Sequence, residues 1–144
     1  MSYWDTSALA KLYAAETDSA DFVARSKITR VFHISRLTHY ELRATLRRKE
    51  AEAAIGKGEA ASSMLIFEGD IMLGDYILHE ETGAVRSKYE EVLEKCYTHS
   101  LPVFVRTADA IHIATALAAG ETEFITADAR QKNAAEVCGL TVQP

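Results

Sequence analysis

The chain has 144 residues, of which 48% are hydrophobic and 26% charged, and its formal net charge at pH 7 is −5. This length and balance predict one globular domain over residues 1–144 that is long enough to bury a core. No apolar run approaches the roughly 20 residues of a membrane span, and no secretion signal opens the chain, so we expect a cytoplasmic protein. The acidic balance argues against non-specific coating of a polyanion, although metal-loaded carboxylates still attract phosphate locally.

The first half of the chain alternates short apolar runs with helical patterns. In chain order, the predicted elements are a strand over 2–5, a helix over 7–15, a helix over 18–25, a strand over 31–34 and a long helix. We predict Ser35 as the N-cap of that long helix, which carries Glu41 and ends at Gly56 and Gly58.

The second half continues the same alternation. We predict a helix over 59–73 and a strand over 75–79, a segment whose pattern also allows a helix. A helix over 82–99, ended by Pro102, and a helix opened by Asp109 follow. The last predicted elements are a strand over 123–126, a helix over 129–138 with Gly139 as its C-cap, and a strand over 140–142. This order predicts an α/β fold with a central, mostly parallel sheet of four or five strands, flanked by helices on both faces. Cys96 and Cys138 stand alone in sequence, which predicts buried reduced thiols and no zinc site.

Four acidic residues occupy positions that a metal-dependent nuclease would need: Asp5 and Asp128 follow predicted strands, Glu41 lies inside a helix, and Asp109 opens an almost wholly apolar helix. In a parallel sheet, the ligand crevice lies beyond the carboxyl ends of the strands. Carboxylates gathered there are costly unless a positive charge neutralises them. Oxygen ligands from several carboxylates suit Mg²⁺ or Mn²⁺, so a shared divalent cation would account for all four acids.

Each acid taken singly also has a structural explanation. Asp5, Asp109 and Asp128 could be helix N-caps or could complement a helix dipole. Glu41 could be a partly exposed helical glutamate. What the metal interpretation adds is a reason for four acids at one end of a sheet.

Four segments resemble the PIN-domain ribonucleases, and most of all the VapC toxins of bacterial type II toxin–antitoxin systems. The segments are Tyr3–Leu9, Tyr40–Leu42, Arg106–Leu117 and Ile125–Asp128. The similarity follows the order and spacing of that family over essentially the full chain, and Arg106–Leu117 is its most specific part. Trp4, where an aliphatic residue is commoner, is a small departure that does not touch the chemistry.

The resemblance implies a single PIN domain and an endoribonuclease toxin that cuts RNA with Mg²⁺ or Mn²⁺. It places the acidic residues of the family at Asp5, Glu41, Asp109 and Asp128, and the hydroxyl that precedes the last acid at Thr126. It also implies a cognate antitoxin as partner and a homodimer, both bound through the early helices. The apolar run from Met64 to Met72 would serve such contacts, although core packing explains it equally well.

Two further features have two interpretations each. Arg43, Arg47, Arg48 and Lys49 follow Glu41 on one helix, with Lys11 as a weaker addition, and they form either a solvated basic face or contacts to the RNA backbone. His112 is either a satisfied, semi-buried histidine or a partner of Asp109.

Other functions remain open at this point. The chain could be a PIN-type nuclease of RNA processing, or a binding module whose acids only cap helices. A phosphatase or receiver-like protein would also place acids at strand ends, but it typically has Asp-x-Asp after the first strand, where this chain has Asp5-Thr6-Ser7.

Overall fold

A five-stranded parallel sheet forms the centre of the protein. The computed structural model describes residues 2–143. The strands are β1 (Ser2–Trp4), β2 (Phe32–Ser35), β3 (Tyr76–His79), β4 (Glu123–Ile125) and β5 (Thr141–Gln143). Their order is β3-β2-β1-β4-β5, and every neighbouring pair is parallel. The predicted sheet is confirmed, including the strand over 75–79.

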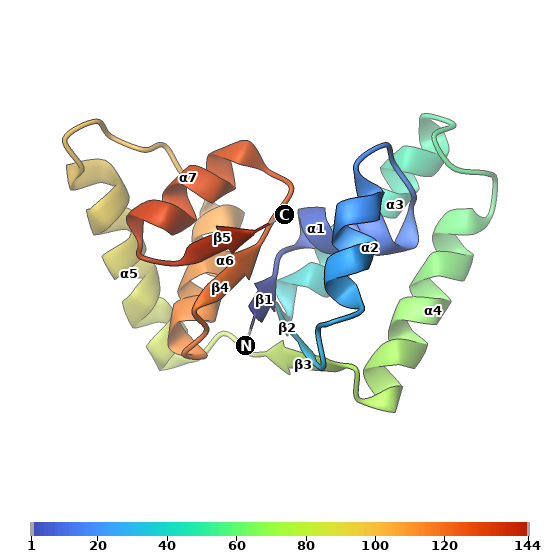
Figure 1. Cartoon of the computed structure of the whole chain (residues 1–144), viewed down its shortest axis with the longest axis horizontal. Helices are drawn as coiled ribbons and strands as arrows, with labels where there is room; N and C mark the ends of the chain where they lie inside the picture. The colour runs from blue at the N-terminus through green and yellow to red at the C-terminus, as the bar shows by residue number, and fades with distance from the viewer. Residues whose placement is uncertain (1, 144) are drawn as a thin grey trace.

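Within residues 2–143, seven helices cover the two faces of this sheet (Figure 1). They are α1 (Thr6–Tyr13), α2 (Ser19–Ser26), α3 (Leu37–Ala51), α4 (Glu59–Leu73), α5 (Gly83–Thr98), α6 (Thr107–Ala118) and α7 (Ala129–Val137). Alternation along β1 separates the two cores. Trp4 packs with residues of α1 to α4, whereas Tyr3 packs with residues of α5 to α7 and stacks on Phe124 of β4 at a centroid distance of 5.4 Å. The predicted helical layers on both faces are confirmed.

The central strand marks the point where the chain reverses its direction of sheet growth. From β1 the chain builds outward through β2 to β3, and it then returns to place β4 on the other side of β1. Such a reversal opens a crevice at the carboxyl ends of the two strands beside it. Asp5 directly follows β1 and Thr126 directly follows β4, so both residues lie at this crevice.

Among the helices, the C-terminal end of α3 differs most from its predicted position. The long helix α3 ends at Ala51, five residues before Gly56. The reason is a left-handed turn at Ala53, whose φ is 55°. There the amides of Ala53 and Ala54 donate to the carbonyls of Glu50 and Lys49, at 3.1 and 2.9 Å, which is the Schellman arrangement normally built on glycine.

The N-terminal ends of α3 and α6 are also displaced. The N-cap position of α3 is Arg36, one residue after the predicted Ser35, although the Ser35 hydroxyl still accepts from the amide of Leu37 at 3.1 Å. Helix α6 starts at Thr107, so Asp109 lies within its first turn and does not open it.

Both cysteines lie in the core between α5 and α7. Cys96 and Cys138 are free thiols and buried, as predicted. Over residues 2–143, none of the helices combines the length and the apolar character that crossing a membrane requires.

Candidate active site

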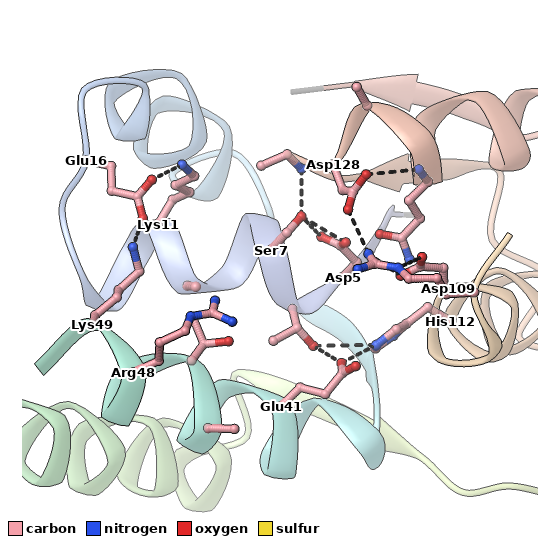
Figure 2. Close-up of a pocket in the computed structure, with 18 residues that line it drawn as sticks. Asp5, Ser7, Lys11, Glu16, Glu41, Arg48, Lys49, Asp109, His112 and Asp128 are labelled. Carbon is pink, nitrogen blue, oxygen red and sulfur yellow. Dashed lines mark hydrogen bonds and ion pairs between the residues drawn. The ribbon is translucent and has the colours of Figure 1, made fainter. Parts of the chain in front are cut away.

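The four predicted acids line one pocket of about 660 Å³ at the crevice beside β1 (Figure 2). Each comes from a different element: Asp5 from the end of β1, Glu41 from α3, Asp109 from α6 and Asp128 from the N-cap of α7. Thr126, the fifth predicted residue, is buried behind Asp5 and donates its hydroxyl to it at 3.0 Å. The fold therefore brings together residues that are more than 120 positions apart in sequence.

Asp5 is a buried carboxylate held by neutral donors. Its side chain accepts from the backbone amide of Ala8 at 2.9 Å, from the Ser7 hydroxyl at 2.9 Å and from Thr126. Burial raises the pKa of Asp5 to about 6, while the charge of His112 and these hydrogen bonds act in the lowering direction without cancelling it. At neutral pH the pocket thus contains a negative charge whose desolvation is only partly compensated.

Glu41 ends a chain of hydrogen bonds that runs through the core. His112 is 2% exposed, and its Nε2 lies 2.6 Å from Glu41 Oε2 while its Nδ1 lies 2.7 Å from the Tyr3 hydroxyl. A carboxylate only accepts, so Nε2 donates to Glu41. Burial raises the pKa of Tyr3 well above its ordinary value, which keeps the hydroxyl at the other end of the bond to Nδ1 protonated.

The Thr6 hydroxyl also donates to Glu41, at 2.6 Å. Burial alone would raise the pKa of Glu41, but the hydrogen bond and charge of His112, together with Thr6 and the charge of Arg106, hold it below the ordinary value. The predicted alternative that His112 partners Asp109 is wrong: its partners are Glu41 and Tyr3.

Asp109 and Asp128 share one guanidinium group. Arg106 donates from Nε and Nη2 to the two carboxylate oxygens of Asp109, at 2.7 and 3.2 Å, and from Nη2 to Asp128 at 2.8 Å (Figure 2). The other oxygen of Asp128 accepts from the backbone amides of Arg130 and Gln131 and so caps α7. The cap interpretation is confirmed for Asp128 and also for Asp5, which caps α1. For Asp109 the N-cap explanation is wrong, because Arg106 holds the N-cap position and Asp109 pairs with it; the position of Asp109 in the first turn of α6 agrees with the helix-dipole explanation.

These contacts decide whether the residues, as arranged, fit a divalent cation. The donors are hard oxygens, as Mg²⁺ and Mn²⁺ require. Within residues 2–143, however, no group of three or more His, Cys, Asp or Glu side chains is placed so that it could hold a metal ion. Two of the four acids are engaged by Arg106, and the other two by hydroxyls, amides and His112. The present arrangement of the side chains does not fit a bound ion.

The far end of the pocket is basic (Figure 2). Lys11 and Lys49 both pair with Glu16, and Lys11 also contacts Asp18 at 2.7 Å. Arg48 is exposed and lines the pocket, and over residues 2–143 its guanidinium forms no ion pair.

Two of the predicted basic residues lie elsewhere. Arg43 pairs with Glu68 of α4 at 3.0 Å, and Arg47 faces Glu50 and a second pocket. Of the basic residues considered for RNA contact, the pocket therefore retains Lys11, Arg48 and Lys49.

Among the pocket residues that had no role in the predictions are Thr6, which donates to Glu41, and three others. Ser7 donates to Asp5 and accepts from the Ala127 amide at 2.9 Å, which ties the first turn of α1 to the segment after β4. Gln131 is 1% exposed, and its Oε1 lies 3.1 Å from the Thr126 hydroxyl oxygen. Arg106 lies three positions before Asp109, a spacing that places both on one helical face, and this was the only one of the three with a usable signal.

Comparison with known proteins agrees with this geometry. The sequence matches the PIN domain family over residues 2–137. The chain belongs to the PIN domain family. Among solved structures, VapC20 of Mycobacterium tuberculosis, described as a sarcin–ricin loop cleaving toxin, superposes with a TM-score of 0.70 at 18% identity, with 100% of each chain covered.

Two further solved structures give similar superpositions on this PIN domain. VapBC2 from Rickettsia felis, bound to a DNA fragment from its promoter, has a TM-score of 0.69 at 16% identity and covers 99% of this chain and 98% of its own. FitAcB from Neisseria gonorrhoeae has a TM-score of 0.70 at 18% identity, with 100% and 97% covered. At these identities the likeness establishes the fold. No curated protein matches the sequence.

Proposed function

We propose that this PIN domain, formed by the whole chain of residues 1–144, is an endoribonuclease toxin that hydrolyses RNA with Mg²⁺ or Mn²⁺. The observation that carries the proposal is the meeting of Asp5, Glu41, Asp109 and Asp128 in one pocket at the sheet reversal. PIN family membership supports nuclease chemistry, and the similarity in fold to a toxin described as cleaving the sarcin–ricin loop supports RNA as substrate.

The residues of the pocket suit distinct tasks in this reaction. Asp5, Glu41, Asp109 and Asp128 would be the metal ligands, and Thr126 and Ser7 would fix the orientation of Asp5. His112 would fix Glu41. Arg48, at the basic end, would contact a phosphate of the RNA away from the cleaved bond.

Asp109→Ala tests the nuclease assignment directly. Removing this carboxylate should reduce RNA cleavage by at least about a hundredfold, as expected for loss of a charged group that acts in the transition state, and should abolish growth inhibition on expression. The measurement is cleavage of a structured RNA by purified protein with Mn²⁺. Glu90→Ala, an exposed acid on α5, is the control and should cleave normally. Equal cleavage of the RNA by both variants would contradict the assignment as a nuclease.

Metal dependence predicts a change in thermal stability. A ligand that binds only the native state raises its apparent stability by mass action. Millimolar Mn²⁺ should therefore raise the melting temperature of the wild type, and Asp109→Asn should weaken that response. Differential scanning fluorimetry against Mn²⁺ concentration, starting from EDTA-treated protein, measures both. An unchanged melting temperature at every concentration would contradict a site made of these acids.

Arg48 and Arg47 form a matched pair for testing RNA contact. They are adjacent on α3, but Arg48 lines the acidic–basic pocket, whereas Arg47 faces Glu50 and the second pocket. Arg48→Ala should weaken RNA binding about three- to tenfold and lower the salt dependence of binding by about one phosphate contact, and Arg47→Ala should not. Filter binding to a non-cleaved RNA at several salt concentrations gives both values. Equal losses would show that only net charge matters.

We further propose a cognate antitoxin as partner and a homodimeric assembly. The solved structures of similar fold include VapC20, which is described as a toxin, and VapBC2 bound to a DNA fragment from its promoter. Helix α4 offers an apolar surface for such contacts: Met64 and Phe67 are buried, as core packing predicted, while Leu65, Ile66 and Met72 are exposed by 59% or more. Growth inhibition by the wild type that the antitoxin relieves would favour a toxin over a nuclease of RNA processing.

A further inference from the structure

One guanidinium group occupies two of the four acids that the proposed function assigns to metal binding. Arg106 donates to both oxygens of Asp109 and to one oxygen of Asp128. The remaining oxygen of Asp128 accepts from backbone amides of α7. Every carboxylate oxygen of Asp109 and Asp128 thus already has a donor in this arrangement.

The hydrogen-bond donors on the carboxylates of the pocket differ in how easily they can be displaced. The amides that contact Asp128 are part of the α7 backbone, and the hydroxyls and amide around Asp5 belong to buried or half-buried residues. The Arg106 side chain is 58% exposed. Its backbone has the extended conformation of the α6 N-cap position, so the long side chain can turn into solvent while α6 stays in place.

A divalent cation and this guanidinium compete for the same oxygens. Both are positive, and a cation bound between Asp109 and Asp128 would lie within a few ångströms of the Arg106 charge, where repulsion is strong in a partly desolvated pocket. The exposure of the side chains indicates which of them moves when a cation binds. Asp109 and Asp128 are 12% and 23% exposed and remain in the pocket, whereas Arg106 can turn out of it.

We propose that Arg106 is an internal latch that closes the metal site of this PIN domain. With Arg106 on Asp109 and Asp128, the four acids are held apart from a shared ion. Release of Arg106 into solvent frees both carboxylates and lets a divalent cation bind. The inference rests on the proposed function and specifies how its metal site is regulated.

The latch makes a quantitative prediction for metal affinity. When only the open state binds, the apparent dissociation constant is the intrinsic one divided by the open fraction. Arg106→Gln removes the competing charge, so it should bind Mn²⁺ about tenfold or more tightly than the wild type. Without metal the same variant should melt at a lower temperature, because Asp109 is left buried without its partner.

The test is titration of Mn²⁺ alone into metal-free wild type, Arg106→Gln and Arg130→Gln by isothermal calorimetry, without RNA. Arg130 is an exposed arginine on α7 beside Asp128, and its removal changes net charge equally. Tighter binding by Arg106→Gln alone supports the latch. Equal affinities in all three proteins overturn the latch and leave the metal-dependent function standing. Absence of binding in all three overturns both.

A second measurement covers the case in which Arg106→Gln does not fold. In the wild type, the Arg106 Nε–H group should give an NMR signal protected from solvent exchange by its bond to Asp109. Saturating Mg²⁺ should remove that protection while α6 stays folded. Continued protection of the signal, with Mg²⁺ binding visible at Asp5 or Glu41, would overturn the latch.

Discussion

Asp5→Asn should raise the free energy of unfolding at pH 7 by about 1–3 kcal/mol and at the same time abolish RNA cleavage. Asp5 is 3% exposed, and burial raises its pKa from 3.8 to about 6. A shift of that size corresponds to at most about 3 kcal/mol of penalty on the ionised form. Asparagine removes the charge and keeps an oxygen that can accept from the Ala8 amide. The stability gain is measured by urea unfolding in EDTA, and cleavage with Mn²⁺.

The raised pKa of Asp5 also determines the direction in which the free energy of unfolding changes with pH. Between pH 4 and pH 6 the native state binds more protons at Asp5 than the unfolded state, so stability falls as the pH rises through this window. The loss is complete above about pH 7, and Asp5→Asn should flatten this part of the curve. Asp21→Asn, at an exposed site on α2, should leave it unchanged. A variant at Asp5 that is less stable than the wild type at pH 7 would contradict this account.

A stabilising substitution that destroys activity would also separate function from structure. Asp5 caps α1, and a cap alone is served by asparagine as well as by aspartate. A charged, buried aspartate with a raised pKa is therefore unfavourable for a mere cap. Residues kept at the expense of stability are typical of functional sites.

Features encoded locally could be predicted from the sequence. The strands that precede Asp5 and Asp128, the long apolar helix after Arg106 and the alternation of strands with helices all depend on neighbouring residues. The structure confirms the resulting sheet and its helical layers. The end of α3 depends equally on local residues, yet it could not be predicted. A left-handed turn is normally marked by glycine, and here Ala53 adopts it.

Contacts between distant residues could be predicted only in part. The meeting of the acids at one pocket follows from the rule that ligands bind beyond the carboxyl ends of parallel strands. The partners of the acids do not follow from any such rule. Tyr3 and His112 are 109 positions apart, and Thr126 reaches Asp5 across 121, so only the packed core shows that His112 serves Glu41. The pairing of Arg106 with Asp109 could have been predicted from the sequence, because the two residues are three positions apart.

His112→Ala should lower the free energy of unfolding by about 2–4 kcal/mol and reduce RNA cleavage. The substitution removes a buried ring together with its hydrogen bonds to the Tyr3 hydroxyl and to Glu41, which then keeps only the bond from Thr6, and such a loss is a known source of large destabilisation. Tyr3→Phe removes only the hydrogen bond between the Tyr3 hydroxyl and His112 and should lower the free energy of unfolding by about 1 kcal/mol. Thermal and urea unfolding of both variants test this order, and equal losses would contradict it.

A positioning role of His112 is separated from a structural one by His112→Gln and His112→Asn. Glutamine can place its amide N–H near the position of Nε2 and keep the bond to Glu41, whereas asparagine reaches only the position of Nδ1 and keeps the bond to Tyr3. If His112 orients Glu41, glutamine should retain more cleavage than asparagine at similar stability. Loss of the bond should also raise the pKa of Glu41, since His112 lowers it, and the acidic limb of the pH–rate profile should move to higher pH in His112→Asn. Cleavage that follows stability alone, with no movement of that limb, would mean that His112 acts only through packing.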